Sequence, residues 1–345
     1  MQRIVRLTLI SAAVGMTLAG GLGCSHSSPL VDRTAVLPSH VILPEGFYPL
    51  AGHYDPDNPE DQYNGWPRYI VSERDNMVMA YVPTQTITMG GGIAPDEVPS
   101  RQVVVSHFYM DLHEITNGQF HKFRKACTRH GPGDVDCYRD YWVRGLNDDH
   151  PVRAVSWLEA RYYSRWIHKV LPTEAQWEAA ARGDDRRIYP WGNEEQVEAA
   201  RYLCNHRTDR ANFDGYEYTA PVMNFAAGVS PYGVFQLSGN VAEWCADWYD
   251  PGRYAYPSDE DLPTGLERGA RAFGDENYPN PIHKILRESR IGPLRGSEKV
   301  VRGGSFSEPI GRCRVDSRWA AGPHAHLNNV GFRCALPLPP EGPQG

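Results

Sequence analysis

The residues of this chain best suited to chemistry lie near its C-terminus, where thiols and arginines accompany two glycine-containing runs. The runs are VRGGSF at residues 301–306 and NVGFRC at residues 329–334, and Cys313 lies between them. Glycine pairs allow turns that a side chain would obstruct, and the neighbouring aromatic and β-branched residues favour short strands. A cysteine thiolate binds soft metals. The two runs therefore predict a site with a rigid floor and an irregular loop.

Three arginines near this site permit two interpretations. A guanidinium can bind a carboxylate or phosphate of a ligand in a bidentate fashion. It can equally pair with an acidic side chain of the same chain. The arginines are Arg314, Arg318 and Arg333, and the candidate acidic partners are Asp316, Glu243 and Asp247.

The composition is that of a globular protein without a nucleic-acid surface. The chain has 345 residues, of which 22% are charged and 41% hydrophobic, so it can bury a sizeable core. Its net charge of −7 and the lack of a basic run disfavour nucleic acid as a partner. The 33 glycines, 28 prolines and 9 tryptophans indicate a loop-rich fold braced by aromatic side chains.

Residues 1–24 resemble an export signal. A short basic start is followed by an apolar stretch, residues 7–20, that is too short to span a bilayer comfortably. The next four residues, GLGC, resemble a bacterial lipoprotein cleavage site at which Cys24 would be acylated. We expect an exported protein, lipid-anchored in the bacterial periplasm or outer membrane. The alternative is an ordinary secretion signal with an incidental Cys24.

Beyond Cys24 the chain has an even number of cysteines, which suits disulfides in an oxidising compartment. Cys127 and Cys137 bracket a stretch rich in Gly and Asp. A local disulfide is favoured there over a metal site, because neither residue belongs to a CxxC pair. The complete set of expected disulfide cysteines is Cys127, Cys137, Cys204, Cys245, Cys313 and Cys334.

Several segments must position these residues. Alternating apolar residues predict strands over residues 77–83, 85–90 and 103–110. Residues 25–70 show no sustained periodicity, which indicates a tether and an extended lead-in. The Pro- and Gly-rich residues 250–299 are expected to form surface loops.

Three helix starts are predicted from capping boxes, in which Ser or Thr is followed three residues later by Glu or Gln. Gly183 is expected to end the third helix, and the first is expected over residues 117–126. The three pairs are Thr116 with Gln119, Ser156 with Glu159, and Thr173 with Gln176.

Four spaced motifs resemble those of the sulfatase-modifying-factor family, which formylglycine-generating enzyme typifies. They are the two glycine-containing runs together, LPTEAQWE at residues 171–178, YPWG at residues 189–192, and YGVFQLSGNVAEW at residues 232–244. The resemblance implies an α+β fold related to C-type lectins, with short strands, few helices and long loops. One domain would span residues 71–338, and residues 339–345 would form a tail.

The resemblance also implies a catalytic loop after the RGGS run. The family's enzymes bind copper(I) with two cysteine thiolates, and oxygen then converts a sulfatase cysteine to formylglycine. Aligned on RGGS, the second thiol is Cys313, but the first falls on Glu308, a hard carboxylate that binds copper(I) poorly. Ser305 and Cys313 are the catalytic residues carried over by the resemblance. We expect the copper-dependent oxidase activity to be lost.

Disulfide pairing is also suggested by the resemblance. The positions of the family's usual disulfide partners hold Ser164, Ala181 and Arg318 in this chain. Cys334 therefore needs another partner, which favours a Cys313–Cys334 disulfide. That pairing would leave no free thiol in the catalytic loop.

Two calcium sites are implied by the resemblance, because calcium prefers carboxylate, amide and main-chain oxygens held in tight turns. In the second site Gln236 replaces the family's Asn. Without an ion, the same residues would simply form turns. The first ligand set is Asn212, the Phe213 carbonyl, Asp214 and the Tyr216 carbonyl, and the second is Gln236, the Gly239 and Val241 carbonyls, and Glu243.

Two functional hypotheses follow. The first is a non-catalytic, lipid-anchored family member that binds a protein or glycan partner, or acts as a scaffold in the cell envelope. The second is an oxidase that makes formylglycine with copper and oxygen.

Overall fold

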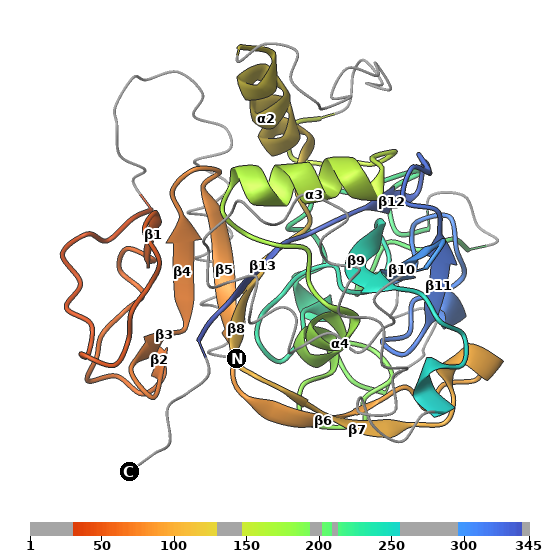
Figure 1. Cartoon of the computed structure of the whole chain (residues 1–345), viewed down its shortest axis with the longest axis horizontal. Helices are drawn as coiled ribbons and strands as arrows, with labels where there is room; N and C mark the ends of the chain where they lie inside the picture. The colour runs from red at the N-terminus through yellow and green to blue at the C-terminus, as the bar shows by residue number, and fades with distance from the viewer. Residues whose placement is uncertain (1–29, 130–146, 194–201, 209–212, 256–295, 340–345) are drawn as a thin grey trace.

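Short strands and long connections dominate this protein. The computed structural model describes residues 30–129, 147–193, 202–208, 213–255 and 296–339. Within them, two larger sheets lie side by side with α-helices packed around them (Figure 1). The expected α+β organisation with few helices is confirmed.

The first sheet joins the beginning of the described chain to its end. Its strands are antiparallel, and β13 pairs with β8 so that Ala335 lies opposite Met110. The order is β1 (Phe47–Pro49), β4 (Tyr69–Ser72), β5 (Met77–Val82), β8 (Phe108–Asp111) and β13 (Ala335–Pro337).

The second sheet contains part of each glycine-containing run, because β10 includes residues 301–302 and β12 is formed by residues 330–331. β10 pairs antiparallel with β11 and β9, whereas β12 runs parallel to β9 with Val330 opposite Ala242. The order is β11 (Arg318–Ala321), β10 (Lys299–Arg302), β9 (Ala242–Trp248) and β12 (Val330–Gly331). Two small hairpins complete the strands: β2 (Gln62–Tyr63) with β3 (Trp66–Pro67), and β6 (Gln85–Met89) with β7 (Arg101–Val105).

The α-helices begin where the capping boxes predict. Both halves of each box are present: the cap hydroxyl accepts a backbone N–H, and the Glu or Gln side chain accepts the N–H of the cap residue. Gly183 caps the end of the last helix, as expected. The helices are α2 (Asn117–Arg129), α3 (Trp157–Trp166) and α4 (Glu174–Arg182), and short 3-10 turns span Pro95–Glu97, Ala226–Gly228, Arg253–Ala255 and Ile310–Arg312.

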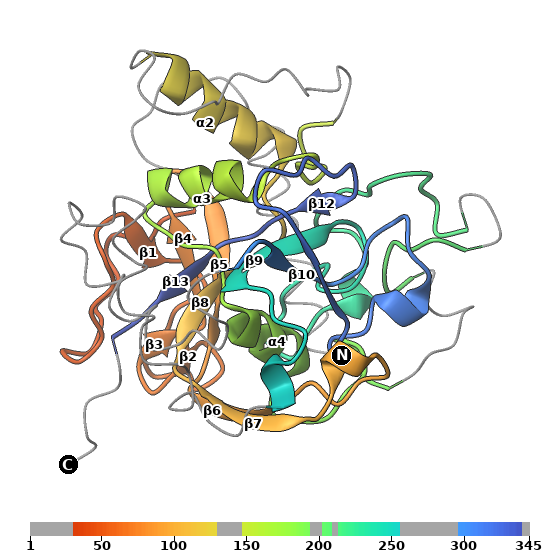
Figure 2. The ribbon, with the colours of Figure 1, turned by 45° about the vertical axis from the view of Figure 1, so that its right-hand side comes forward.

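The helices lie on different sides of the sheets. Figures 1 and 2 show α2 and α3 along one side and the β6–β7 hairpin along the opposite side. α4 packs against β6, β7, β9 and β10, so it sits at the junction of the hairpin and the second sheet. No helix in the described ranges is long and apolar enough to cross a membrane.

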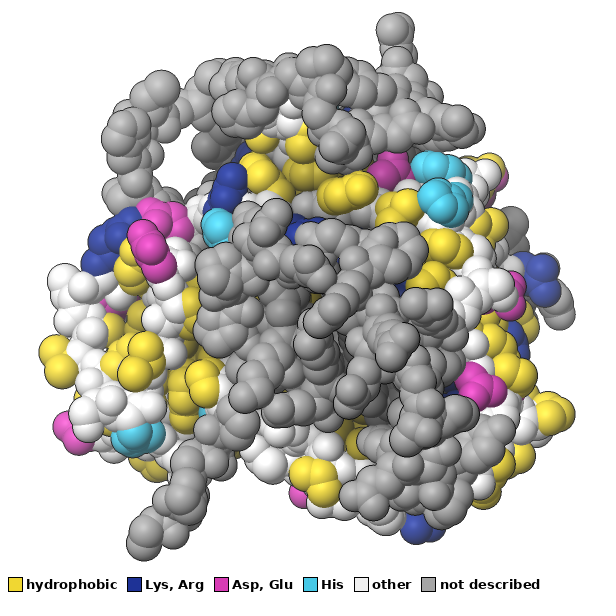
Figure 3. Space-filling model, in the orientation of Figure 1, with side chains coloured by type: hydrophobic (Ala, Val, Ile, Leu, Met, Phe, Trp, Pro, Cys, Tyr) yellow, Lys and Arg dark blue, Asp and Glu magenta, His cyan; other side chains and the backbone are white. Residues whose placement is uncertain are grey.

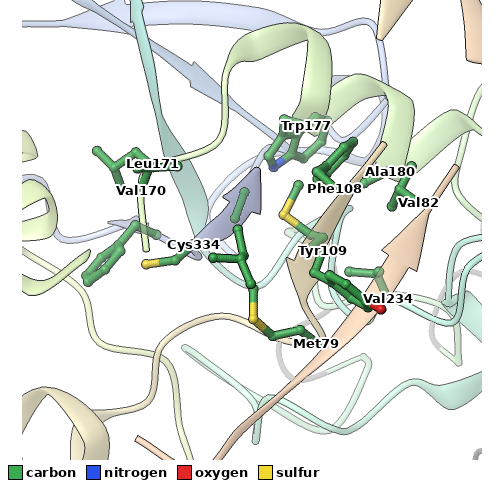
Figure 4. Packing of buried hydrophobic residues seen from close by; sticks show 14 of the residues in the cluster. Met79, Val82, Phe108, Tyr109, Val170, Leu171, Trp177, Ala180, Val234 and Cys334 are labelled. Carbon is green, nitrogen blue, oxygen red and sulfur yellow. The ribbon is translucent and has the colours of Figure 1, made fainter. Parts of the chain in front are cut away.

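The hydrophobic core is continuous between the sheets. Trp177 of α4, Phe108 of β8 and Met79 of β5 are fully buried in it. Figure 4 shows these side chains together with Tyr109, and shows Cys334 in the same cluster beside Val170 and Leu171.

Two segment predictions need correction. The strand expected over residues 103–110 is two strands, because the chain changes partner at Ser106 and His107: β7 pairs with β6, and β8 pairs with β5. The lead-in is also more than a tether. It contributes β1 to β3 and buries side chains such as Phe47 and Trp66, which places it within the fold.

Candidate functional site

The RGGS run ends β10 and presents Ser305 to a polar cluster. The Ser305 hydroxyl donates to Oε2 of Glu308 at 3.3 Å and accepts from Nδ2 of Asn329 at 3.2 Å. It also lies 3.0 Å from the hydroxyl of Ser307. Two loops that are distant in sequence, residues 305–308 and the segment just before β12, therefore meet at this serine.

Glu308 is the residue for which the resemblance implies the first copper thiolate of the family's enzymes. Its carboxylate is partly buried and lies 4.0 Å from Nε of Arg312. Burial raises the pKa of Glu308, although Arg312 and Ser305 oppose that shift. The group is a hydrogen-bonded oxygen acid, which a soft metal ion does not favour.

Cys313 is fully buried beneath the same loop. Burial and then the charge of Glu308 raise the pKa of the Cys313 thiol, and backbone N–H groups of Ser305 and Gly239 only partly offset them. Gly304 has φ +64°, and a Cβ there would lie 2.7 Å from the Cys313 sulfur. The RGGS turn thus needs glycine both for its backbone and for its contact with the thiol. One thiol and one carboxyl group do not make up the pair of soft sulfur donors that a two-thiolate copper(I) site requires.

A second thiol lies near Cys313, and the sequence analysis did not anticipate it. Cys204 is buried, and its sulfur lies 3.7 Å from Nδ1 of His206. Burial is the main cause that raises the pKa of Cys204, and the charge of Cys313 is the second cause that raises it. The two thiols are therefore within electrostatic range of each other. No spacing rule could reveal this, because Cys204 comes from a loop far away in the sequence.

The structure departs from the expected disulfides. The five cysteines in the described ranges are all free thiols, and Cys137 lies outside those ranges. Cys334 faces the main core, where its backbone N–H donates to Asp111 Oδ2 at 2.8 Å, whereas Cys313 contacts the RGGS turn. The two residues belong to different environments, so the expected Cys313–Cys334 bond is not formed. The described free thiols are Cys127, Cys204, Cys245, Cys313 and Cys334.

The second expected calcium set gives a mixed result. Oε1 of Gln236 is buried and has no hydrogen-bond partner. This is what is expected of a metal-binding oxygen when no metal ion is present. The Glu243 carboxylate, in contrast, accepts two hydrogen bonds from Arg333, at 2.7 and 2.8 Å, and one from Trp177 at 2.8 Å. Gln236 therefore fits a cation, while Glu243 already has a cationic partner. Gly239 and Val241 lie in the turn between them.

The first calcium set lies partly outside the described residues, because Asn212 is not among them. The Asp214 carboxylate accepts backbone N–H groups of His206 and Tyr216, each at 3.1 Å. Phe213 and Tyr216 flank this turn. The described part of the set is thus a hydrogen-bonded turn, and no group of three or more His, Cys, Asp or Glu in the described ranges is arranged to hold a metal.

The three arginines near the site all have structural partners. Arg333 pairs with Glu243, as the second interpretation allowed. Arg314 pairs with Asp316 at 2.9 Å and also with Glu97 at 2.6 Å. Arg318 pairs instead with Glu174 at 2.7 Å. These guanidinium groups therefore hold the fold together.

The comparisons with known proteins agree with the geometry. A family model described as "Sulfatase-modifying factor enzyme 1-like domain" matches residues 70–338. The chain belongs to the sulfatase-modifying factor family. It is 34% identical to the formylglycine-generating enzyme of Thermomonospora curvata over 74% of this chain and 92% of that protein. The mouse formylglycine-generating enzyme is 28% identical and is matched over 74% of each chain.

Other proteins that this chain is similar to carry different names. The chain is 30% identical to the serine/threonine-protein kinase pkn1 of Chlamydia pneumoniae, but the match covers only 40% of that protein and 78% of this chain. Among solved structures, PvdO from Pseudomonas aeruginosa superposes with a TM-score of 0.60 and 23% identity, over 78% of this chain and 98% of PvdO. This structural likeness shows a shared fold.

We expect removal of the Glu308 charge to make Cys313 more acidic. Glu308→Gln abolishes a negative charge that raises the pKa of the thiol, so the Cys313 thiolate should form at lower pH than in the wild type. The measurement is the pH dependence of the ultraviolet thiolate absorbance, taken as the difference from a matching variant that also carries Cys313→Ser. Glu298→Gln, which changes an exposed acid, serves as the matched control and should leave the profile unchanged. An identical profile in Glu308→Gln would contradict the assigned electrostatics.

Proposed function

We propose that this sulfatase-modifying-factor protein is a binding or scaffold member of its family that lacks the copper-dependent oxidase activity. The observation that supports this most directly is Glu308, a carboxyl group at the first thiolate position. It is hydrogen-bonded to Ser305 and raises the pKa of Cys313. Ser305 and Cys313 then act as structural residues of a ligand-binding loop.

We also propose that the protein acts in the cell envelope, exported and held by a lipid on Cys24. The support is the N-terminal sequence: a basic start, a short apolar stretch and a lipoprotein-like GLGC. These residues lie outside the described ranges. The partner would be a protein or a glycan of the envelope, met at the surface around Ser305.

A second candidate function is a formylglycine-generating oxidase with a rearranged site. It is favoured by the 34% identity to a formylglycine-generating enzyme over 92% of that enzyme's length. It is also favoured by Cys204, a free thiol whose pKa responds to Cys313. In this reading the thiol that is missing at position 308 is supplied by another loop.

A copper(I) titration with a competing chelator, combined with a peptide assay, separates the two candidates. We expect the wild type to bind no stoichiometric copper(I) and to leave a sulfatase-type cysteine peptide without an aldehyde by mass spectrometry. Glu308→Cys should introduce copper(I) binding that is lost again in the Glu308→Cys, Cys313→Ser double variant. Stoichiometric copper binding by the wild type that disappears in both Cys204→Ser and Cys313→Ser, or aldehyde formation, would establish the oxidase instead.

The lipid anchor is tested by expressing the full chain in a Gram-negative bacterium with labelled palmitate. The wild type should carry the label and sediment with membranes, because two or more acyl chains anchor a protein stably. Cys24→Ser should be unlabelled and remain in the supernatant. A wild-type protein that is cleaved elsewhere and carries no lipid would contradict the anchor.

We propose, in addition, that calcium binds at Gln236 and its neighbouring carbonyls. The support is the buried, unpartnered Oε1 of Gln236, an oxygen donor of the kind that calcium prefers. Binding to the folded state alone would stabilise it by mass action.

Calcium at about 100 times its dissociation constant should raise the melting temperature by roughly 3–6 °C relative to chelator. Gln236→Gly removes the amide oxygen while tolerating the φ of 54° at this position, and it should abolish the shift. Magnesium at the same concentration is the control, because it demands a more regular octahedral shell. An equal melting temperature with calcium and with chelator would refute the site.

A further inference from the structure

A partly buried arginine at the edge of the Ser305 cluster has no acidic partner. Nη1 of Arg153 donates to the main-chain oxygen of Asn328 at 3.0 Å. Its Nε is shielded from solvent and forms no hydrogen bond. Within the described ranges no carboxylate pairs with it, unlike Arg314, Arg318 and Arg333. Desolvation lowers the pKa of Arg153, as expected for a partly buried cation that has no carboxylate beside it.

Two aromatic rings flank this guanidinium. Its central carbon lies 5.9 Å from the ring centroid of Tyr218 and 5.9 Å from that of Phe306. The two rings meet edge to face, with centroids 5.9 Å apart. Tyr218 is 55% exposed, so an apolar surface faces solvent directly beside the cation. Rings and an arginine arranged in this way can bind a ligand that has both an apolar face and an acidic group.

The backbones of Tyr218 and Phe306 are held in place by hydrogen bonds. The carbonyl of Tyr218 accepts from Nδ2 of Asn205 at 2.7 Å, and the N–H of Phe306 donates to the carbonyl of Asn240 at 2.9 Å. Asn205 and Asn240 are themselves joined by a 3.1 Å side-chain hydrogen bond. A ligand would therefore meet rings that are attached to an already fixed backbone, which reduces the entropic cost of binding.

The same surface continues into the Ser305 cluster. Phe306 directly follows Ser305, and Asn328 precedes Asn329, which donates to the Ser305 hydroxyl. The result is a patch with a cationic, aromatic half and a half made of hydroxyl, amide and carboxyl groups. Such groups both donate and accept hydrogen bonds, which suits a ligand that carries many hydroxyls.

The loop before β12 extends this rim with histidine. Nδ1 of His326 lies 3.0 Å from the carbonyl oxygen of Ala154 and 3.5 Å from Oε2 of Glu159. In Figure 3 histidine and acidic side chains lie beside hydrophobic ones at the end of α3 that is close to β12. This end of the molecule therefore offers polar groups next to an apolar surface.

Main-chain groups argue against an extended peptide as the occupant. The N–H of Phe306 is bound to Asn240, that of Ser307 to the Ser305 hydroxyl, and that of Glu308 to the Ser305 carbonyl. No free ladder of backbone donors remains in this loop for strand addition, the usual way in which an extended peptide gains affinity. A sugar needs side-chain hydrogen bonds and a ring to stack on, and both are present.

We propose that this patch binds an acidic sugar of the uronate type. The sugar carboxylate pairs with the guanidinium of Arg153, and one face of the pyranose packs on Tyr218 and Phe306. Its hydroxyls reach the side chains of the Ser305 cluster. This inference rests on the proposed binding function, because it names the ligand class of the same site.

The test uses the purified protein with trigalacturonate as the probe and neutral maltotriose as the matched uncharged sugar, measured by calorimetry or ligand-observed NMR. Trigalacturonate should bind at least about 10-fold more tightly than maltotriose, since hydrogen bonds to charged groups add that much. Its affinity should fall as salt is raised, because partly exposed charges are screened.

Variants locate the binding on the patch. Arg153→Gln should weaken trigalacturonate binding at least about 10-fold, and Arg153→Lys should weaken it less, because the charge stays while the planar fork is lost. Tyr218→Ala should weaken binding of both sugars. Arg186→Gln removes an exposed arginine elsewhere and should leave the affinity within about two-fold, since such a charge makes little contribution. Circular dichroism verifies that each variant is folded.

Three results would overturn the inference: equal affinity for the two sugars, undiminished affinity in Arg153→Gln, or a tetraglutamate peptide that binds more tightly than trigalacturonate. None of them affects the proposed loss of oxidase activity, which depends on copper and aldehyde measurements. If the protein makes aldehyde, the proposed function fails whatever the sugar result.

Discussion

Buried ion pairs between α4 and the second sheet hold this loop-rich protein together. Arg302 of β10 pairs with Glu178 and lies 3.4 Å from Glu174, and Arg318 of β11 binds Glu174 through two nitrogens at 2.7 and 2.9 Å. Arg182 adds a third cation, 2.8 Å from Glu178. Loss of one partner of such a pair typically costs about 3–5 kcal/mol, because the other charge stays buried and uncompensated. These contacts fix the position of α4, and with it the floor beneath the RGGS turn.

The same constraint shapes the chemistry of the site. The arginines that follow Cys313 are committed to structural carboxylates, as Arg333 is to Glu243. The charge of Arg312 lowers the pKa of Cys313, but burial and the charge of Glu308 raise it and prevail. In this member of the family, the surroundings of Cys313 favour the protonated thiol over the thiolate.

Local features of the fold were predictable, and features that depend on the path of the chain were not. Thr173 and Gln176 predict a helix start, because the hydrogen bonds between them join residues that are only three positions apart. β1 and β2 were missed because strands of two or three residues are too short to show periodicity. The pattern over residues 103–110 looked continuous because alternation carries no information about a change of partner strand.

For the site, the sequence located Ser305, Glu308 and Cys313 on one loop and matched them to the family. It could not predict that Cys204 comes within electrostatic range of Cys313, or that Arg153 lies near Phe306, because such proximity arises only when distant loops meet. The disulfide expectation shows the same limit. An even cysteine count gives no information about distance, and Cys313 and Cys334 belong to separate environments.

Asn240 has a consequence for how such a protein can diverge. With φ 60°, it receives the Ala220 N–H at 2.8 Å and donates to Glu114 at 3.0 Å through its amide, while its backbone holds Asn205 and Phe306. Four segments, around Glu114, Asn205, Ala220 and Phe306, are thereby docked on a single residue. Mutations in those segments can alter what the surface recognises while the docking point stays intact. New specificities could thus arise by exchange of loop sequences on an inherited framework, with no need to rebuild the core.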